Sequence, residues 1–286
     1  MSEEPTEAHN RSESEPAPEA TIPKGTWRSL LVPFGPSVAL DLLLGACVLA
    51  TAMNALPDPS RGRTARLLRR AASAGALLPW AYLLIVRPWH LRWGATDEEA
   101  RKRLPGDELV PRPVVEATRA LTINASAKEI WPWMVQMGAG RGGLYSYDWL
   151  ENLAGLGIHS VDRIVPELQD LKEGDVFPLD APSGTGPTVA ELVPARAIVL
   201  HFLDLRAGRS VLSWAYFLDQ VDEDTTRLIF RFKLDIDPRP LWSLVYALLI
   251  DIPHFVMERK MMVGIKDRAE RANFRSPSTL DPREHP

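Results

Sequence analysis

The chain has almost no cysteine. Cys47 is the only one among its 286 residues, so no disulfide can form within the chain. The six histidines are scattered, and none lies in a Cys/His cluster with zinc-ligand spacing, so no metal site is expected. A Gly-x-Ser-x-Gly motif is also absent, and a Ser/His/Asp set would need isolated residues such as His159 and His201. These absences predict a chain with no metal, no cofactor and no identifiable catalytic residue.

Positive charge is not gathered in any part of the sequence. The formal charge is −4, and residues 1–25 account for all of it, with six glutamates against Arg11 and Lys24. The remaining residues balance, with 31 acidic and 31 basic side chains. Nucleic-acid binding requires a clustered basic face, so nucleic acid is not an expected partner.

Residues 1–25 are rich in Glu, Pro and Ser and poor in apolar side chains. Such a segment buries too little apolar surface to offset its chain entropy, and it is predicted to be a disordered acidic tail. Its acidic start excludes a signal peptide. Residues 276–286 are predicted to form a second, short tail.

Two long apolar stretches follow the acidic tail. Residues 36–56 are mostly apolar and long enough to span a bilayer core of roughly 30 Å. Residues 71–86 are uncharged, and the flanking Arg70 and Arg87 can snorkel to an interface. We predict that residues 26–92 form a transmembrane hairpin in the cell membrane; a buried hairpin packed on the soluble domain is the alternative. Arginines occur both between and after the stretches, so the positive-inside rule leaves the orientation open.

A dense glycine turn occupies residues 138–143. Three of its glycines fit the pattern G-x-G-x-x-G, which binds dinucleotides only when it follows a strand and opens a helix. Here it follows a segment with a capping box, Ser126 and Glu129, and with apolar residues at helical spacing. We therefore predict helices over residues 126–137 and 146–156, the second capped by its own Ser or Asp. The turn between them needs glycine for its geometry and not for phosphate binding.

The second half of the domain is predicted to be a sheet covered by a helix. One apolar face is clearest in the last strand, where Leu228, Phe230, Phe232 and Leu234 alternate with charged residues. An antiparallel sheet with one wet face needs a cover on the other, and the helix predicted over residues 241–271, broken or kinked by a proline, supplies it. The predicted strands are 114–123, 176–179, 189–193, 197–203, 210–221 and 227–236.

Three motifs carry a resemblance to a known superfamily: QMGAGRGGLYSYDWLENL, IHSVDRIVPELQDLKEGD and FVMERKMMVGIKDRAE. From about residue 107 to 272 the chain resembles the SRPBCC superfamily of START and Bet v 1-like helix-grip proteins, and the motifs resemble a membrane-associated bacterial branch of it. The resemblance implies an α+β fold in which an antiparallel sheet wraps around a long C-terminal helix and leaves a tunnel. We expect this domain at residues 107–275, joined to the hairpin by a linker at 93–106.

Aromatic and methionine side chains are the candidates for the tunnel wall, although ordinary core packing explains them as well. Arg141 lies between glycines; it either pairs with a nearby acid to fix the turn, which we favour, or meets an anionic head group at the tunnel mouth. The candidate ligand-binding residues are Arg141, Tyr145, Tyr147, Trp214, Tyr216, Phe230, Phe232, Phe255, Met257 and Met261.

Three functions are open at this point. The first is binding or transfer of a hydrophobic small molecule or lipid by a membrane-tethered protein. The second is a cyclase or dehydratase acting on a polyketide-like substrate, which the superfamily resemblance permits; it requires a polar pair in the tunnel with perturbed pKa values, and the sequence shows no obligatory pair. The third is an interaction scaffold whose tunnel is filled by its own side chains. Binding is preferred over catalysis, and the oligomeric state is left open.

Overall fold

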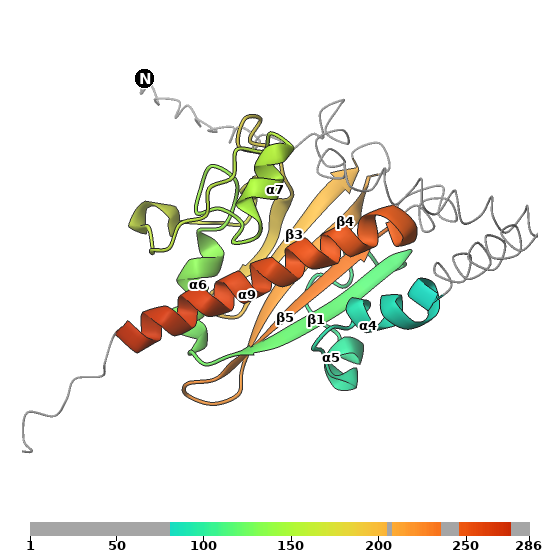
Figure 1. Cartoon of the computed structure of the whole chain (residues 1–286), viewed down its shortest axis with the longest axis horizontal. Helices are drawn as coiled ribbons and strands as arrows, with labels where there is room; N and C mark the ends of the chain where they lie inside the picture. The colour runs from blue at the N-terminus through green and yellow to red at the C-terminus, as the bar shows by residue number, and fades with distance from the viewer. Residues whose placement is uncertain (1–80, 205–207, 236–245, 276–286) are drawn as a thin grey trace, which may run out of the picture.

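The computed structural model describes residues 81–204, 208–235 and 246–275. Within them, five strands form one antiparallel sheet in the order β1-β5-β4-β3-β2. The α+β helix-grip prediction is confirmed for this part of the chain, because a long C-terminal helix packs across the sheet (Figure 1). The strands are β1 (Val115–Ile123), β2 (Thr188–Val193), β3 (Ala197–Asp204), β4 (Arg209–Gln220) and β5 (Thr226–Leu234).

The helical elements lie on both sides of the sheet and at its ends. Figure 1 shows α9 running in front of the sheet, with α6 and α7 near one end and α4 and α5 beside β1. The elements are η2 (Tyr82–Val86), α4 (Arg87–Leu91), α5 (Asp97–Arg101), α6 (Ala127–Val135), α7 (Asp148–Leu153), η3 (Pro166–Leu168), η4 (Tyr246–Ile250) and α9 (Asp251–Arg275).

The predicted strand at 176–179 is wrong. Val176 makes only an isolated bridge to Thr188, and the backbone N–H groups of Phe177 and Leu179 donate to Pro187 and Thr185. This segment pairs with the residues leading into β2 too irregularly to form a strand. It becomes one of the loops at the end of the sheet.

The capping box of α6 is confirmed, since the Glu129 carboxylate accepts from both the backbone N–H and the hydroxyl of Ser126. The predicted cap of α7 is wrong. Asp148 lies inside that helix, and its carboxylate accepts instead from the backbone and hydroxyl of Ser160, at 2.6 Å each. Ser146 donates to the Met257 carbonyl of α9. Both polar side chains tie α7 to neighbouring segments.

The C-terminal helix changes character near Pro253. The α-helical segment α9 begins at Asp251, and the residues just before it, in η4, have π-helical geometry. Proline has no N–H to donate, so it is tolerated in the first turn of a helix and not in its middle. The predicted break is therefore a change from π-helical to α-helical geometry between Ile250 and Asp251, just before Pro253. Residues 241–245 of the predicted helix lie outside the described residues.

The inner face of the sheet forms the main core with α6 and α9. Leu228, Phe230, Phe232 and Leu234 of β5 are all buried there, as the alternation predicts. Met261, Met262 and Ile265 of α9 belong to the same apolar cluster.

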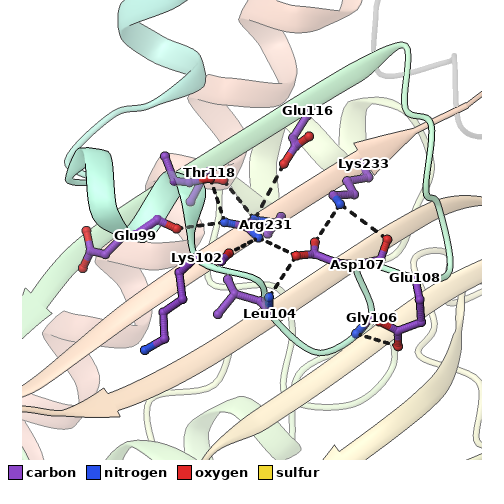
Figure 2. A network of polar contacts seen from close by, with 11 residues as sticks. Glu99, Lys102, Leu104, Gly106, Asp107, Glu108, Glu116, Thr118, Arg231 and Lys233 are labelled. Carbon is purple, nitrogen blue, oxygen red and sulfur yellow. Dashed lines mark hydrogen bonds and ion pairs between the residues drawn. The ribbon is translucent and has the colours of Figure 1, made fainter.

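The outer face of the sheet is not wet, which corrects the expectation from the strand pattern. Arg231 and Lys233 of β5 are only 3% and 7% exposed. Residues 99–109, most of which were predicted to be a linker, lie over them (Figure 2). This segment also places Leu104 in a second apolar cluster with Phe217 and Ile229.

Asp107 is the centre of this outer contact. Its carboxylate binds Arg231 Nη1 at 2.7 Å and Lys233 Nζ at 2.8 Å (Figure 2). Arg231 also donates to the backbone carbonyls of Lys102 and Glu99, each at 2.8 Å. Nearby, Glu99 of α5 pairs with Arg227 at 2.8 Å.

The predicted membrane hairpin falls mostly outside the described residues, as do the two tails. Across residues 81–204, 208–235 and 246–275, no helix is both long and apolar enough to cross a membrane. Only the end of the second predicted segment is described, where residues 82–86 form η2. The hairpin itself stays a prediction.

Replacing Asp107 by alanine should destabilise the fold by about 3 kcal/mol, because it leaves two buried cations without their anion. The matched control is Asp219→Ala. Asp219 pairs with Lys102 at 3.3 Å on the exposed surface, and its loss should cost less than about 1 kcal/mol. Urea unfolding of both variants measures the difference. Equal midpoints would show that the outer segment contributes no more than an ordinary surface contact.

Candidate functional site

A cavity of about 170 Å³ lies between α7, α9, the sheet and the loop at residues 177–186. Its walls are mostly apolar, and three acidic side chains and one histidine interrupt them. The residues that line it are Leu144, Ser146, Glu151, Leu156, Phe177, Leu179, Asp180, Thr185, Gly186, Phe202, Trp214, Tyr216, Phe230, His254, Met257, Glu258 and Met261.

The volume of the cavity limits the size of a ligand that it can hold. An engineered apolar cavity of about 150 Å³ in another protein holds benzene, whereas sites for drug-sized ligands span roughly 300–1,000 Å³. The cavity therefore encloses a ring-sized group. A longer molecule could place only one end inside and would leave the rest at the loop side, where Asp180 and Thr185 are partly exposed.

The structure brings half of the candidate ligand-binding residues together in this cavity. Trp214 and Tyr216 enter from β4 and Phe230 from β5, while Met257 and Met261 enter from α9. Tyr216 and Phe230 pack edge to face with ring centroids 4.8 Å apart, and the Tyr216 hydroxyl lies 3.5 Å from the Met261 sulfur.

The other aromatic candidates lie elsewhere. Tyr145 is fully buried, and its hydroxyl donates to the Trp133 carbonyl. The Arg268 guanidinium lies over its ring. Phe232 stacks on Tyr246 of η4, the segment just before α9. These two rings are packed in the core.

Phe255 and Tyr147 are also outside the cavity lining. Phe255 stacks on His90 with centroids 5.1 Å apart, on the side of α9 that faces α4. Tyr147 occupies the N-cap position of α7.

Arg141 is bonded to the backbone. Its Nη2 donates to the carbonyls of Leu168, at 3.0 Å, and Val135, at 3.3 Å. The guanidinium thus fixes the glycine turn, although through carbonyls and not through the acidic partner that we expected. It is not among the residues that line the cavity.

The glycine turn follows α6 directly and closes on itself through Gly138 and Gly143, so the strand that a dinucleotide site needs is not in front of it. Gly143 has φ +83°, and a Cβ there would lie 2.4 Å from the Ser160 backbone. Gly142 differs: its φ is not positive, and glycine is needed because a Cβ would lie 2.8 Å from the Gln136 carbonyl oxygen.

The cavity residues that sequence reasoning missed include two buried acids, Glu151 and Glu258. Glu151 of α7 is 1% exposed, and neither of its carboxylate oxygens has a hydrogen-bond partner among the described residues. Burial, and then the nearby Asp148 charge, raises the pKa of Glu151 to about 7, and the Ser146 hydroxyl beside it opposes that rise. The Ser146 hydroxyl donates to the Met257 carbonyl. This acid therefore changes its charge near neutral pH.

Only one of the two carboxylate oxygens of Glu258, in α9, has a partner among the described residues. Its Oε2 accepts from Arg119 Nη1 of β1 at 2.6 Å, while its Oε1 has no partner in the described part of the chain. Burial raises the pKa of Glu258 to about 7, and the Arg119 charge opposes that rise.

His254 lies one turn before Glu258 and belongs to the same polar cluster. Its Nε2 is 3.6 Å from the Glu258 carboxylate, and its Nδ1 is 2.7 Å from the Tyr246 hydroxyl. Burial lowers the pKa of His254 to about 3, so this imidazole is neutral at ordinary pH.

A signal for the Glu258 pair was present in the sequence. Glu258 lies on the apolar stripe of α9, between Phe255 and Met262, and Arg119 lies at an inward position of β1. A charge at a core position of each element indicates that the two charges meet. Glu151 carried no comparable signal, because it follows Asp148 on a helix of only six residues that shows no clear apolar stripe.

The chain was compared with known proteins. No protein-family model and no curated protein matches it. Among solved structures, it is similar to a polyketide-cyclase-like protein from Corynebacterium glutamicum at 13% identity, with a TM-score of 0.36, over 61% of this chain and 99% of that one. A protein from Mesorhizobium loti matches at 10% identity, with a TM-score of 0.32, over 55% of this chain and 98% of the other. These likenesses are weak, and nothing about the activity of this chain follows from them.

Glu151→Gln should change the pH dependence of stability. A carboxyl whose pKa is about 7 in the folded state and near 4.3 when unfolded stabilises the fold below that range, and this contribution is lost as the pH rises to about 7. The neutral amide does not titrate. The variant should therefore gain stability over the parent between pH 5 and pH 8, by up to about 3 kcal/mol.

Thermal unfolding at pH 5 and pH 8 measures this gain. Glu167→Gln, on the exposed η3 turn, is the matched control and should follow the parent at both values. Parallel curves for Glu151→Gln and the parent would show that the buried carboxyl titrates normally.

Proposed function

We propose that this chain binds a small hydrophobic molecule in the cavity between α7, α9 and the sheet. The observation that carries the proposal is a cavity of about 170 Å³ whose walls, from the sheet, α9 and the loop at 177–186, are mostly apolar. Burial of a ring against such walls is favourable by about 25 cal/mol per Å² of apolar surface removed from water. A filled interior, as in the scaffold alternative, would have left no such space. A lipid would bind by inserting one end only.

Toluene is a suitable first probe because it is a single apolar ring. We expect saturable chemical-shift changes for the cavity methionines Met257 and Met261 in the NMR spectrum. Leu179→Trp should fill the cavity from the loop side and abolish them. Val176→Trp, on the same loop with an exposed side chain, is the control and should leave binding intact. Shifts that persist unchanged in Leu179→Trp would place the ligand elsewhere.

We propose further that residues 26–92 tether the domain to a membrane. Support comes from the apolar stretches 36–56 and 71–86 and from exposed apolar side chains at and just after the end of the second stretch. Leu84, Ile85 and Trp89 are 71%, 69% and 59% exposed, and large apolar side chains exposed together mark interaction surfaces.

The full chain should sediment with membranes and resist carbonate extraction, whereas a chain starting at residue 81 should be soluble. The truncation must keep α4 and α5, because Arg119 donates to the His90 carbonyl and Arg231 binds Asp107. Recovery of the full chain in the soluble fraction would contradict the tether.

One observation favours a second function, general acid–base catalysis of the cyclase or dehydratase kind. Glu151 and Glu258 line the same apolar cavity with pKa values near 7, as proton transfer at neutral pH requires. The test is exchange of the methyl protons of acetophenone in D₂O, followed by NMR. Catalysed exchange that Glu151→Gln abolishes would establish this chemistry; exchange at the buffer rate would exclude it for this probe.

A further inference from the structure

The charged side chains that line the cavity are all acidic. Glu151, Asp180 and Glu258 line it, and no lysine or arginine is among the described residues that do so. Arg119 lies behind Glu258 and neutralises that one carboxylate through a 2.6 Å contact. The cavity therefore keeps unneutralised negative charge, which disfavours anionic ligands such as fatty acids.

Glu151 is the group that requires a partner. A buried carboxylate whose oxygens accept no hydrogen bond is costly, because its water has been removed and nothing replaces it. Within the described chain neither oxygen of Glu151 accepts a hydrogen bond, because the nearby Ser146 hydroxyl donates to the Met257 carbonyl, and Oε1 of Glu258 accepts none either. Groups that line a cavity and lack partners can be satisfied by a ligand that donates N–H or O–H bonds.

The walls favour a cation among such donors. Aromatic faces attract an ammonium group through the ring quadrupole, by about 0.5–2 kcal/mol per ring depending on desolvation. Five aromatic side chains line the same cavity as the carboxyl groups. They are Phe177, Phe202, Trp214, Tyr216 and Phe230.

A metal ion is a poorer match than an ammonium group. Among the described residues, no three His, Cys, Asp or Glu side chains lie close enough to hold one. Hard cations such as Ca²⁺ and Mg²⁺ need six or more oxygen ligands, whereas the cavity offers a few carboxylate oxygens in an apolar setting.

We infer that the cavity binds a small amine, with a ring-sized apolar body against the aromatic and methionine walls and a protonated nitrogen that donates to Glu151. Glu258, whose Oε1 has no partner within the described chain, lines the same cavity. This inference rests on the proposed function, small-molecule binding, and adds the charge and chemical class of the ligand.

Three probes of nearly equal size test it: benzylamine, benzyl alcohol and benzoate, each titrated into the full chain by NMR or calorimetry. Benzylamine should bind at least about tenfold more tightly than benzyl alcohol, and benzoate should not bind measurably. Equal or tighter binding of the alcohol or of benzoate would overturn the amine assignment and leave the proposed function standing. No binding by any of the three would contradict the proposed function itself.

Glu151→Gln removes the charge and keeps the shape. In this variant benzylamine and benzyl alcohol should bind with similar affinities, and the alcohol should bind as it does to the parent. Glu167→Gln, exposed on the surface, is the control and should keep the full preference for the amine. A preference that survives Glu151→Gln would show that another group holds the nitrogen, and would overturn the role given to Glu151.

The affinity for benzylamine should fall as the pH is lowered, because the amine binds the ionised form of Glu151. With a pKa of about 7 in the empty site, binding should be roughly tenfold weaker at pH 6 than at pH 8. Binding of benzyl alcohol should not fall in the same way. A pH-independent affinity for the amine would argue against a carboxylate partner.

The other groups that border the cavity do not reverse this direction. Burial lowers the pKa of His254 to about 3 and raises the pKa of Tyr216, so neither changes charge between pH 6 and pH 8. Glu258 gains negative charge in the same direction as Glu151. The remaining carboxylates are Asp148, on the same helix as Glu151, and Asp180, on the loop.

Discussion

An ion pair between Arg119 and Glu258 joins the sheet to the helix that covers it. Its two side chains are 0% and 2% exposed, and the bonded atoms are 2.6 Å apart. Arg119 also donates to the His90 carbonyl, so the pair connects α4, β1 and α9 at one point. Removing either partner would leave a buried charge uncompensated, which typically costs 3–5 kcal/mol, and this fixes the position of α9 over the sheet. Glu258 also lines the cavity, so this ion pair joins one wall of the cavity to the sheet.

The opposite face of the sheet is closed by the same kind of interaction. Arg231 and Lys233 point away from α9, and Asp107 binds both from the segment that precedes β1. Buried ion pairs therefore lie on both faces of the sheet, with Arg119 of β1 on the α9 side and Arg231 and Lys233 of β5 on the other. This arrangement explains why α5 and the residues after it are part of the fold, and why the domain cannot be cut at the end of the apparent linker.

The cavity combines features that select against the ligands most often expected of an apolar tunnel. Its size suits one ring, and its acidic groups disfavour carboxylates. Arg141, the one basic residue that could have met an anionic head group, is held by the carbonyls of Leu168 and Val135. Aromatic walls next to an unpartnered carboxylate form a chemical environment suited to an amine.

The sequence by itself determined most of the helices and strands and the inward face of β5. The capping box at Ser126, the alternation of β5 and the proline at 253 are local signals, because each acts through hydrogen bonds or side-chain directions within a few residues. They predicted β1, α6, β5 and the start of α9 closely. They failed at 176–179, where the pairing partners are loop residues and no local pattern records them.

Only the tertiary structure decided the site. Half of the candidate ligand-binding residues line the cavity, and the others pack elsewhere. The sequence could not predict this division, because the same apolar residue can border either a cavity or a packed neighbour. Glu151 became a site residue only when α7 was placed against α9 and the loop at 177–186, because burial without partners depends on what surrounds a group. Asp107 and Arg231 are more than a hundred residues apart in the sequence, and only the fold brings them together. No local pattern could therefore predict that they form an ion pair.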